Sequence, residues 1–273
     1  MIRKVYPQLL GIIGGGNMAQ AILDGINNNK YFKPESIMIS EPNIKTRKLL
    51  AVKYGTIAIY DNNQILNSCQ NILLAIKPVK FKEIGKEFII PSTNNSNKQN
   101  IISLMAGINH LELNTIFGDS NIFRCMPNTS AKINKSVTIW HTDCKDETAL
   151  HIVSDFFSNL GFHQKVDDEL LIEKATAICG SGPAYIYDLM ENMIDASVLI
   201  GVERELATKM VVNTFEGTSL MAKKNESNIH NLKKNIVSPG GTTAQALYQL
   251  EKHGFKNSIN EAVLAAYKHS IGK

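Results

Sequence analysis

Residues 9–19 read LLGIIGGGNMA, an apolar run that ends in three consecutive glycines before an apparent helix. Glycine loses more conformational entropy on folding than any other residue. Three glycines in succession are therefore expected where the chain makes a tight turn or leaves room for a ligand. Gly14, Gly16 and Ala19 match the pattern G-x-G-x-x-G/A, between a predicted strand and a predicted helix. We predict that this loop binds a dinucleotide; a glycine-rich turn with no ligand is the alternative.

Each small residue has a separate task in such a loop. Gly14 permits the tight turn, Gly16 lets the backbone approach a diphosphate, and Ala19 allows close packing of helix and strand. The free N–H groups at the start of the helix attract the phosphates. The predicted contacts in this segment are Ile13, Gly14, Gly15, Gly16, Asn17 and Met18.

The choice between NADH and NADPH is expected at the end of the second predicted strand, where Ser40 and Glu41 stand. Glu41 could accept a hydrogen bond from a ribose hydroxyl, which favours NADH. Lys45 and Arg47 follow closely and could attract a 2′-phosphate, which favours NADPH. These residues favour different cofactors, so the cofactor is expected to be NADPH or NADH.

The first half of the chain predicts an α/β fold. Short apolar runs rich in β-branched residues alternate with helical patterns at 17–28 and 43–55, and Gly55 is placed to close the second helix. Runs that are apolar throughout indicate a parallel sheet covered on both faces by helices. A polar segment at 91–100 is expected to be a surface loop. The predicted strands are 8–14, 36–40, 56–60, 71–78, 100–107, 121–127 and 136–142.

The second half is predicted to be helical. After about residue 165 the strands stop, and long helical patterns follow at 184–201, 203–224, 242–254 and 258–270, the last with Ser258 and Glu261 in capping-box spacing. Large apolar residues such as Met193, Met210 and Met221 require either a core of this domain or a second subunit. We predict domains at 1–165 and 166–273.

Composition excludes several other classes. The net charge is +4, and its lysines and arginines are scattered, unlike the basic stripe of a nucleic-acid-binding protein. The four cysteines form no CxxC pair and the histidines no close pair, so we expect no metal site. No apolar run approaches the roughly 18 residues that span a bilayer. Cleavage of the basic–apolar start as a signal peptide would destroy the glycine loop, so we expect a cytoplasmic protein with no nucleic-acid or membrane partner.

Six motifs together resemble the pyrroline-5-carboxylate reductase family. They occur in register along nearly the whole chain, and the last is part of IVSPGGTTAQALYQLE. The motifs are GIIGGGNMA (11–19), LLAIKP (73–78), ISLMAG (102–107), RCMPNT (124–129), CGSGPAY (179–185) and SPGGTT (238–243).

The resemblance implies a fold and a reaction. The expected fold is α/β, with an N-terminal Rossmann-type dinucleotide-binding domain and a C-terminal all-helical dimerisation domain. The expected reaction is the reduction of 1-pyrroline-5-carboxylate to L-proline by NADPH or NADH, the last step of proline biosynthesis. The expected assembly is a homodimer or a larger homo-oligomer.

The resemblance also implies further cofactor contacts. Lys77 and Pro78 are expected to end a buried strand, and the stretch from Ala75 to Pro78 to line the ribose–nicotinamide side of the cofactor. Ordinary turn chemistry is the alternative for the two turns expected to hold the nicotinamide ring. The contacts implied are Ala75, Ile76, Lys77, Pro78, Asn62 on the adenosine side, Ala106, Gly107, Pro127 and Asn128.

The late segment SPGGTT is the expected substrate loop. The start of a helix offers free N–H groups and two threonine hydroxyls to a small carboxylate; an N-capped helix after a turn is the alternative. The resemblance gives Thr243 the further role of hydrogen-bonding the ring nitrogen of the substrate, which makes it the expected catalytic residue. The implied substrate contacts are Ser238, Gly240, Gly241, Thr242, Thr243 and Glu226.

Two departures and two alternatives remain open. Lys234 stands where the family commonly has aspartate, and Ser130 stands where proline is usual. A related hydroxy-acid dehydrogenase would carry a lysine on the helix that runs from Tyr185 to Ile200, and none is present. A non-catalytic protein that kept the fold is the other alternative, because fold does not fix function.

Overall fold

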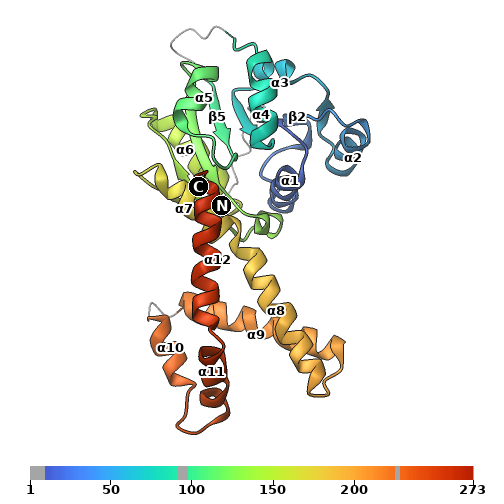
Figure 1. Cartoon of the computed structure of the whole chain (residues 1–273). Coiled ribbons are helices and arrows are strands. Elements are labelled where there is room, and N and C mark those ends of the chain that lie inside the picture. Colours follow the sequence, from blue (N-terminus) through green and yellow to red (C-terminus); the bar gives the residue numbers. More distant parts are fainter. Residues whose placement is uncertain (1–9, 92–97, 225–227, 273) are drawn as a thin grey trace. The chain divides into compact units, whose positions relative to one another are not determined.

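The computed structural model describes residues 10–91, 98–224 and 228–272. They form two compact units (Figure 1). The first comprises the residues up to Ser181 together with those from Ala266 onward, and the second comprises Gly182–Ala265. The domain boundary at 165/166 stays a prediction, because a compact unit and a functional domain are different divisions of a chain.

The described strands of the first unit form one sheet of eight in the order β3-β2-β1-β4-β5-β6-β7-β8. Several strands are shorter than the apolar runs that predicted them. The last residues of these runs lie in the loops at the carboxyl edge of the sheet rather than in the strands. Their bounds are β1 Leu10–Ile13, β2 Ile37–Ser40, β3 Ile57–Ile59, β4 Asn71–Leu74, β5 Asn100–Ser103, β6 Asn121–Met126, β7 Ser136–His141 and β8 Gly161–Lys165.

Strand β1 occupies the position where the winding of the sheet reverses. It pairs in parallel with β2, with Leu10 opposite Ile37, and with β4, with Leu10 opposite Asn71. The chain runs outward from β1 through β2 to β3, and then crosses back to β4 on the other side. In open α/β sheets, ligands bind beyond the carboxyl ends of the strands at such a reversal. The glycine loop begins directly after Ile13, at this point.

The expectation of a wholly parallel sheet is wrong at one strand pair. Strands β6 and β7 are antiparallel, with Cys125 opposite Trp140. A parallel return needs a crossover of a dozen or more residues, usually through a helix that covers the sheet. Only residues 127–135 connect these strands, which is too short for that crossover.

The sequence prediction also missed β8. This edge strand pairs in parallel with β7, but only along one side, and its residues Gly161–Lys165 read GFHQK, with Phe162 58% exposed. A strand at the edge of a sheet can carry polar side chains, so its sequence lacks the apolar run that identified the other strands.

Helices cover the sheet on both faces. Gly55 closes α2 with a φ of 67°, and Asn109 and Glu112 form a capping box at the start of α5. Residues 92–97 of the predicted 91–100 loop lie outside the described residues. The helices of this unit are α1 Asn17–Asn29, α2 Ile44–Tyr54, α3 Asn62–Ser68, α4 Pro78–Ile84, α5 His110–Phe117, α6 Glu147–Ser158 and α7 Leu170–Ala175; the short turns are η1 Pro34–Ser36, η2 Gly85–Glu87, η3 Thr129–Ile133 and the π-helical η4 Thr176–Gly180.

Alternate residues of the central strands enter two separate cores. Along β4, Leu73 packs with the side chains of α1 and α6 on one face. Ile72 and Leu74 pack with those of α3, α4 and α5 on the other face. Successive side chains of a strand point to opposite faces, so a strand buried on both sides is apolar at most positions rather than at every second one. The runs at 72–74 and 10–13 therefore show no alternation of polar and apolar residues.

The second unit consists of helices. Gly254 has a φ of 75° just after α11, and α12 begins before Ser258. The predicted capping box at Ser258 and Glu261 is therefore wrong: Ser258 lies inside the helix and its hydroxyl donates to the carbonyl of Gly254 at 3.2 Å. The helices are α8 Gly182–Leu199, α9 Arg204–Lys224, α10 Ile229–Asn235, α11 Thr242–Lys252 and α12 Phe255–Ser270, whose last residues belong to the first unit.

The second unit leaves most of its apolar side chains exposed. In its described residues, 182–224 and 228–265, only Gly182, Ala207 and Val211 are buried. Met210 and Met221 are 53% and 54% exposed. Exposed apolar surface on this scale marks an interaction site. Of the two explanations for these residues, a second subunit is favoured over a core within the domain.

Candidate functional site

The glycine loop has the backbone geometry of a strand–turn–helix ligand site. Gly14 adopts a φ of +100°, and a Cβ there would stand 2.8 Å from the carbonyl oxygen of Ala75, so only glycine fits without strain. Gly16 is the N-cap of α1, and a Cβ on it would meet no heavy atom within 4 Å. The space beside Gly16 and the free N–H groups of the first turn of α1 fit a diphosphate.

A cavity of about 410 Å³ opens at this loop. It lies beyond the carboxyl ends of β1, β2, β3 and β4, the edge at which the topology predicts a ligand. Nine of the predicted cofactor contacts line it: Gly14, Gly15, Gly16, Ser40, Glu41, Asn62, Ala75, Ile76 and Lys77.

Hydrogen bonds fix the polar side chains on the β2 side of this cavity. The carboxylate of Glu41 accepts from the backbone N–H of Gly15 at 3.0 Å and from that of Asn43 at 2.8 Å. The hydroxyl of Ser40 donates to Oδ1 of Asn62 at 2.6 Å. Asn62 lines the cavity, and its side-chain amide nitrogen is a hydrogen-bond donor.

On the β4 side, the prediction for Lys77 and Pro78 needs correction. Strand β4 ends at Leu74; Lys77 is the N-cap residue of α4, and Pro78 is the first residue of that helix. Proline fits the first helical position because its missing N–H would have no intrahelical partner there. Lys77 still lines the cavity, but from a helix start rather than from the end of a strand.

Sequence reasoning missed several lining residues. Tyr60 and Asp61 directly follow β3, as Ser40 and Glu41 follow β2, so the rule that ligands bind at carboxyl strand ends could have found them. Lys80 lies on α4, whose contribution to the cavity depends on how the helix packs. The missed residues are Pro42, Tyr60, Asp61, Asn63, Lys80, Ile84, Glu87 and Phe88.

The other predicted contacts do not line this cavity. Ile13 is fully buried in β1, Asn17 is exposed at the start of α1, Met18 packs against the core, and Pro78 begins α4. The turn after β5 carries Ala106 and Gly107, where Gly107 has a φ of +70°. Their contact with a cofactor stays a prediction.

Asn128 follows β6, and its side chain is committed to the protein. Its amide nitrogen donates to the carbonyl of Cys179 at 3.1 Å, and its Oδ1 accepts from the N–H of Ser130 at 3.2 Å. The first bond holds the Pro127–Thr129 turn against the π-helical η4, and the second is local to the turn. They favour the turn-chemistry alternative for the Asn128 side chain, and leave the predicted cofactor contact of this turn untested.

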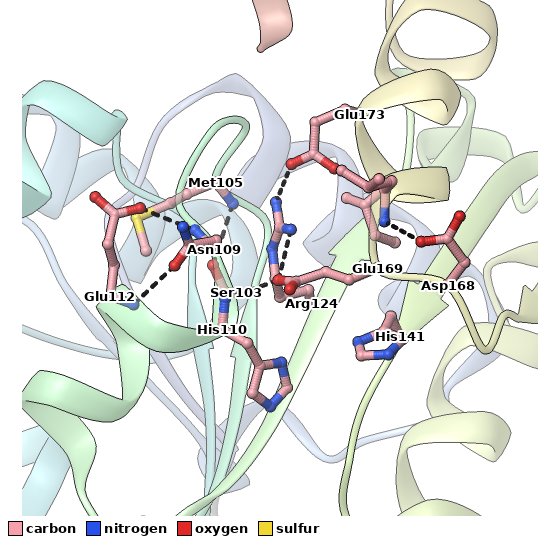
Figure 2. A network of polar contacts seen from close by, with 12 residues as sticks. Ser103, Met105, Asn109, His110, Glu112, Arg124, His141, Asp168, Glu169 and Glu173 are labelled. Atoms are coloured by element: carbon pink, nitrogen blue, oxygen red, sulfur yellow. Dashed lines mark hydrogen bonds and ion pairs between the residues drawn. The ribbon is translucent and has the colours of Figure 1, made fainter. Parts of the chain in front are cut away.

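A buried ion cluster supports the neighbouring β5–α5 turn (Figure 2). Arg124 of β6, 2% exposed, donates to Glu169 at 2.8 Å and to Glu173 of α7 at 2.7 Å. Glu169 also accepts from the backbone N–H of His110 at 2.7 Å. Burial raises the pKa of Glu169, but the hydrogen bonds from Arg124 and His110 outweigh it and leave the pKa below its ordinary value.

The predicted substrate loop belongs to the second unit. Gly240 has a φ of +71°, the N–H of Gly241 donates to the carbonyl of Ser238 at 3.1 Å, and Gly241 is the N-cap of α11. Thr242 and Thr243 are therefore the first two residues of a helix, as predicted, with their N–H groups unpaired within it. Glu226 lies outside the described residues.

Metal-ligand clusters and membrane-spanning helices are both absent from the part of the chain that the structure describes. In those residues, no group of three or more histidine, cysteine or acidic side chains is placed to hold a metal ion. Likewise, no described helix is both long and apolar enough to cross a membrane.

Comparison with known proteins agrees with this arrangement. A family model described as pyrroline-5-carboxylate reductase dimerisation matches residues 169–272, and one described as NADP oxidoreductase, coenzyme F420-dependent, matches residues 9–107. The two matches correspond to the helical half and to the part of the sheet domain that carries the glycine loop.

Several relatives that match over nearly the whole chain are named pyrroline-5-carboxylate reductase. The chain is 35% identical over 267 residues to a pyrroline-5-carboxylate reductase of Synechocystis, covering 97% of this chain and 98% of the relative. A crystal structure of Plasmodium falciparum pyrroline carboxylate reductase with NADP bound matches with a TM-score of 0.88 and 31% identity, covering 98% and 99% of the two chains. The enzyme from Coxiella burnetii matches with a TM-score of 0.82 and 29% identity, covering 97% and 98%. By this full-length similarity, the chain belongs to the pyrroline-5-carboxylate reductase family.

Proposed function

We propose that this protein is an NAD(P)H-dependent oxidoreductase that reduces the C=N bond of 1-pyrroline-5-carboxylate to give L-proline, the last step of proline biosynthesis. The observation that carries the proposal is the glycine-loop cavity at the sheet reversal, in a chain similar over its whole length to reductases of that name. When bound, the reduced nicotinamide supplies the hydride.

The residues of the first unit have the task of binding and orienting the cofactor. The N–H groups at the start of α1 hold the diphosphate, and Gly16 leaves room for its approach. Lys77 and Lys80, which line the cavity from the β4 side, add positive charge beside it. Ser40, Glu41 and Asn62 orient the adenosine ribose. We assign Ala75, Ile76, Ala106, Gly107, Pro127 and Asn128 to the nicotinamide side on the strength of the family resemblance.

The loop from Ser238 to Thr243 has the task of holding the substrate. Its backbone N–H groups at the start of α11 bind the carboxylate, and Gly240 permits the turn with its positive φ. The hydroxyl of Thr243 hydrogen-bonds the ring nitrogen and orients it for protonation. A protonated imine accepts hydride readily, so positioning and exclusion of water are the protein's main contributions. Glu226 is assigned to the same site by resemblance alone.

The exposed apolar helices are assigned to subunit pairing. The family model that matches this half is named for dimerisation, and Met193, Met210 and Met221 lie exposed on its helices. We propose a homodimer or a larger homo-oligomer in which these faces are buried. Size-exclusion chromatography with light scattering tests this assembly. The expected cytoplasmic location stays a prediction.

The decisive experiment is an assay of the purified full chain. Consumption of reduced nicotinamide is followed with 1-pyrroline-5-carboxylate, and the L-proline formed is measured by mass spectrometry. Hydroxy acids with the oxidised cofactor serve as the comparison. Proline formation that depends on both enzyme and cofactor supports the proposal, whereas turnover of a hydroxy acid instead, or of neither, overturns it.

A further inference from the structure

We propose that Glu41 selects against a 2′-phosphate and makes this protein prefer NADH to NADPH. The proposal rests on the proposed function, in that the glycine-loop cavity holds a nicotinamide dinucleotide. By residue type, Glu41 favours NADH, whereas the cations Lys45 and Arg47 favour NADPH. The contacts of Glu41 and Arg47 in the structure decide between them.

The position of Glu41 places it beside the ribose. It directly follows β2, the strand that pairs with β1 on the β3 side, and it lines the cavity with Ser40 and Pro42. In dinucleotide-binding sheets, an acidic residue at this point reaches the ribose 2′ position of the bound cofactor. The cofactor group that distinguishes NADPH from NADH would therefore meet this carboxylate.

The carboxylate is held in place from two sides. Its Oε2 accepts from the N–H of Gly15 in the glycine loop, and its Oε1 accepts from the N–H of Asn43 at the start of α2. Each oxygen keeps acceptor capacity for a ribose hydroxyl, since a carboxylate offers about four acceptor positions and no donor. A phosphate also has only acceptors near neutral pH, so it gains no hydrogen bond here and meets charge repulsion.

Arg47, one of the two candidate phosphate partners, is already hydrogen-bonded to the chain. Its Nη1 donates to the backbone carbonyl oxygens of Glu41 at 2.7 Å and Pro42 at 3.2 Å. Its guanidinium also lies over the ring of Tyr60, 5.7 Å from the centroid. Arg47 does not line the cavity, and neither does Lys45, which is exposed on the first turn of α2. The two Nη1 hydrogen bonds hold this side chain against the backbone at residues 41 and 42.

The distribution of charge around the cavity also favours NADH over NADPH. Glu41 after β2 and Asp61 after β3 are both acidic, and among the described residues no lysine or arginine lines the cavity from these two strand ends. Both lining lysines, Lys77 and Lys80, follow β4, which lies on the opposite side of β1 from β2. Positive charge is thus available to the diphosphate near β1 and β4, while the 2′ side is acidic.

Binding titrations without substrate test the proposal. Dissociation constants of NADH and NADPH are measured by calorimetry for the wild type and for Glu41→Gln, which removes the charge and keeps the size of the side chain. We expect the wild type to bind NADH at least about tenfold more tightly than NADPH, because a like charge opposes the phosphate. In Glu41→Gln, the ratio of the two constants should fall by about fivefold or more, mainly through tighter NADPH binding.

Two further variants sharpen the result. Glu35→Gln removes an exposed carboxylate before β2 that does not line the cavity, and it should leave the ratio unchanged. In Arg47→Met, the affinity for NADPH relative to that for NADH should not fall. A selective loss of NADPH affinity in Arg47→Met would show that Arg47 turns to the phosphate, and would overturn the proposal. Circular dichroism and thermal unfolding check that each variant is folded.

The outcomes separate this inference from the proposed function. If NADPH binds the wild type as tightly as NADH or more tightly, or if a folded Glu41→Gln keeps the wild-type ratio, the selection role of Glu41 is overturned while the reductase proposal stands. If neither nucleotide binds, both proposals fail.

Discussion

The guanidinium of Arg124 and the carboxylate of Glu169 lie 2.8 Å apart, and the same carboxylate oxygen accepts the backbone N–H of His110 at 2.7 Å (Figure 2). This partly buried ion pair therefore joins β6 to the residue that precedes α7 and to the first residue of α5. Since α5 follows the turn that carries Ala106 and Gly107, this pair fixes the end of that turn. Arg124 and Glu173 complete the cluster at 2.7 Å.

Removal of the cation should destabilise the fold strongly. Arg124→Met leaves the carboxylates of Glu169 and Glu173 near each other without a positive partner, and breaking a buried pair in this way costs about 3–5 kcal/mol. Urea unfolding followed by the fluorescence of Trp140, the only tryptophan and 3% exposed, measures the change.

An exposed pair provides the control for Arg124. Arg204 lies 2.6 Å from Asp195, but both side chains are more than half exposed. Arg204→Met should change the free energy of unfolding by less than about 1 kcal/mol. Equal effects of the two substitutions would contradict the role that we give to the buried cluster.

Two glycine substitutions should separate folding from cofactor binding. Gly16→Leu places its side chain in open space, so the thermal midpoint should change little while the dissociation constant of NADH rises about tenfold or more through steric exclusion of the diphosphate. Gly14→Ala should instead lower stability by about 1–3 kcal/mol, since its φ of +100° and the nearby carbonyl of Ala75 oppose a Cβ. Unchanged NADH binding in Gly16→Leu would contradict the loop assignment.

Loss of the Thr243 hydroxyl should impair the reaction without unfolding the protein. Thr243→Val keeps the shape of the side chain, and kcat/KM for 1-pyrroline-5-carboxylate should fall between about tenfold and several hundredfold, or about 1.4–3.5 kcal/mol. NADH affinity should stay the same, because the loop at 238–243 is assigned to the substrate. Thr208→Val, on the exposed first turns of α9, is the matched control. Near-normal turnover of Thr243→Val would reject its role.

Stability should fall as the pH drops below about 7. Burial lowers the pKa of His110 and of His163 below the ordinary value of 6.5, although Asp143 and Glu169 partly offset this at His110. At pH 6 the unfolded chain then binds more protons than the folded one, so the stability present above pH 6.5 is lost as the pH falls through the folded-state pKa values.

The urea midpoint of the wild type, measured from pH 8 to pH 5, should show this decline. His110→Phe removes one of the two titrating histidines and keeps a ring against His141. The urea midpoint of this variant should therefore fall less between pH 8 and pH 5 than that of the wild type. The same change at His151, which is exposed on α6, should preserve the wild-type slope. A steeper decline in His110→Phe would show that the sign of the His110 effect is wrong.

Local residue pattern determined the parts of the protein that depend on neighbours in sequence. The apolar runs, the three glycines and the start of α1 fixed the β1–loop–α1 unit, and the positive φ of Gly14 and Gly55 followed from their positions in turns. The start of α11 at Thr242 was predictable for the same reason. The cofactor contacts that lie just beyond β1, β2 and β4 could be inferred because parallel strands end at one edge.

Tertiary structure decided what depends on pairing and packing at long range. Contacts between distant segments decide the antiparallel pairing of β7 with β6, the place of the polar strand β8 at the sheet edge and the contribution of Lys80 to the cavity. Local periodicity encodes none of these features. By residue type alone, Glu41 and Arg47 favour opposite cofactors. Only the folded chain shows the guanidinium bound to two backbone carbonyls and the carboxylate facing the cavity, because a hydrogen-bond partner is assigned by three-dimensional proximity rather than by residue type.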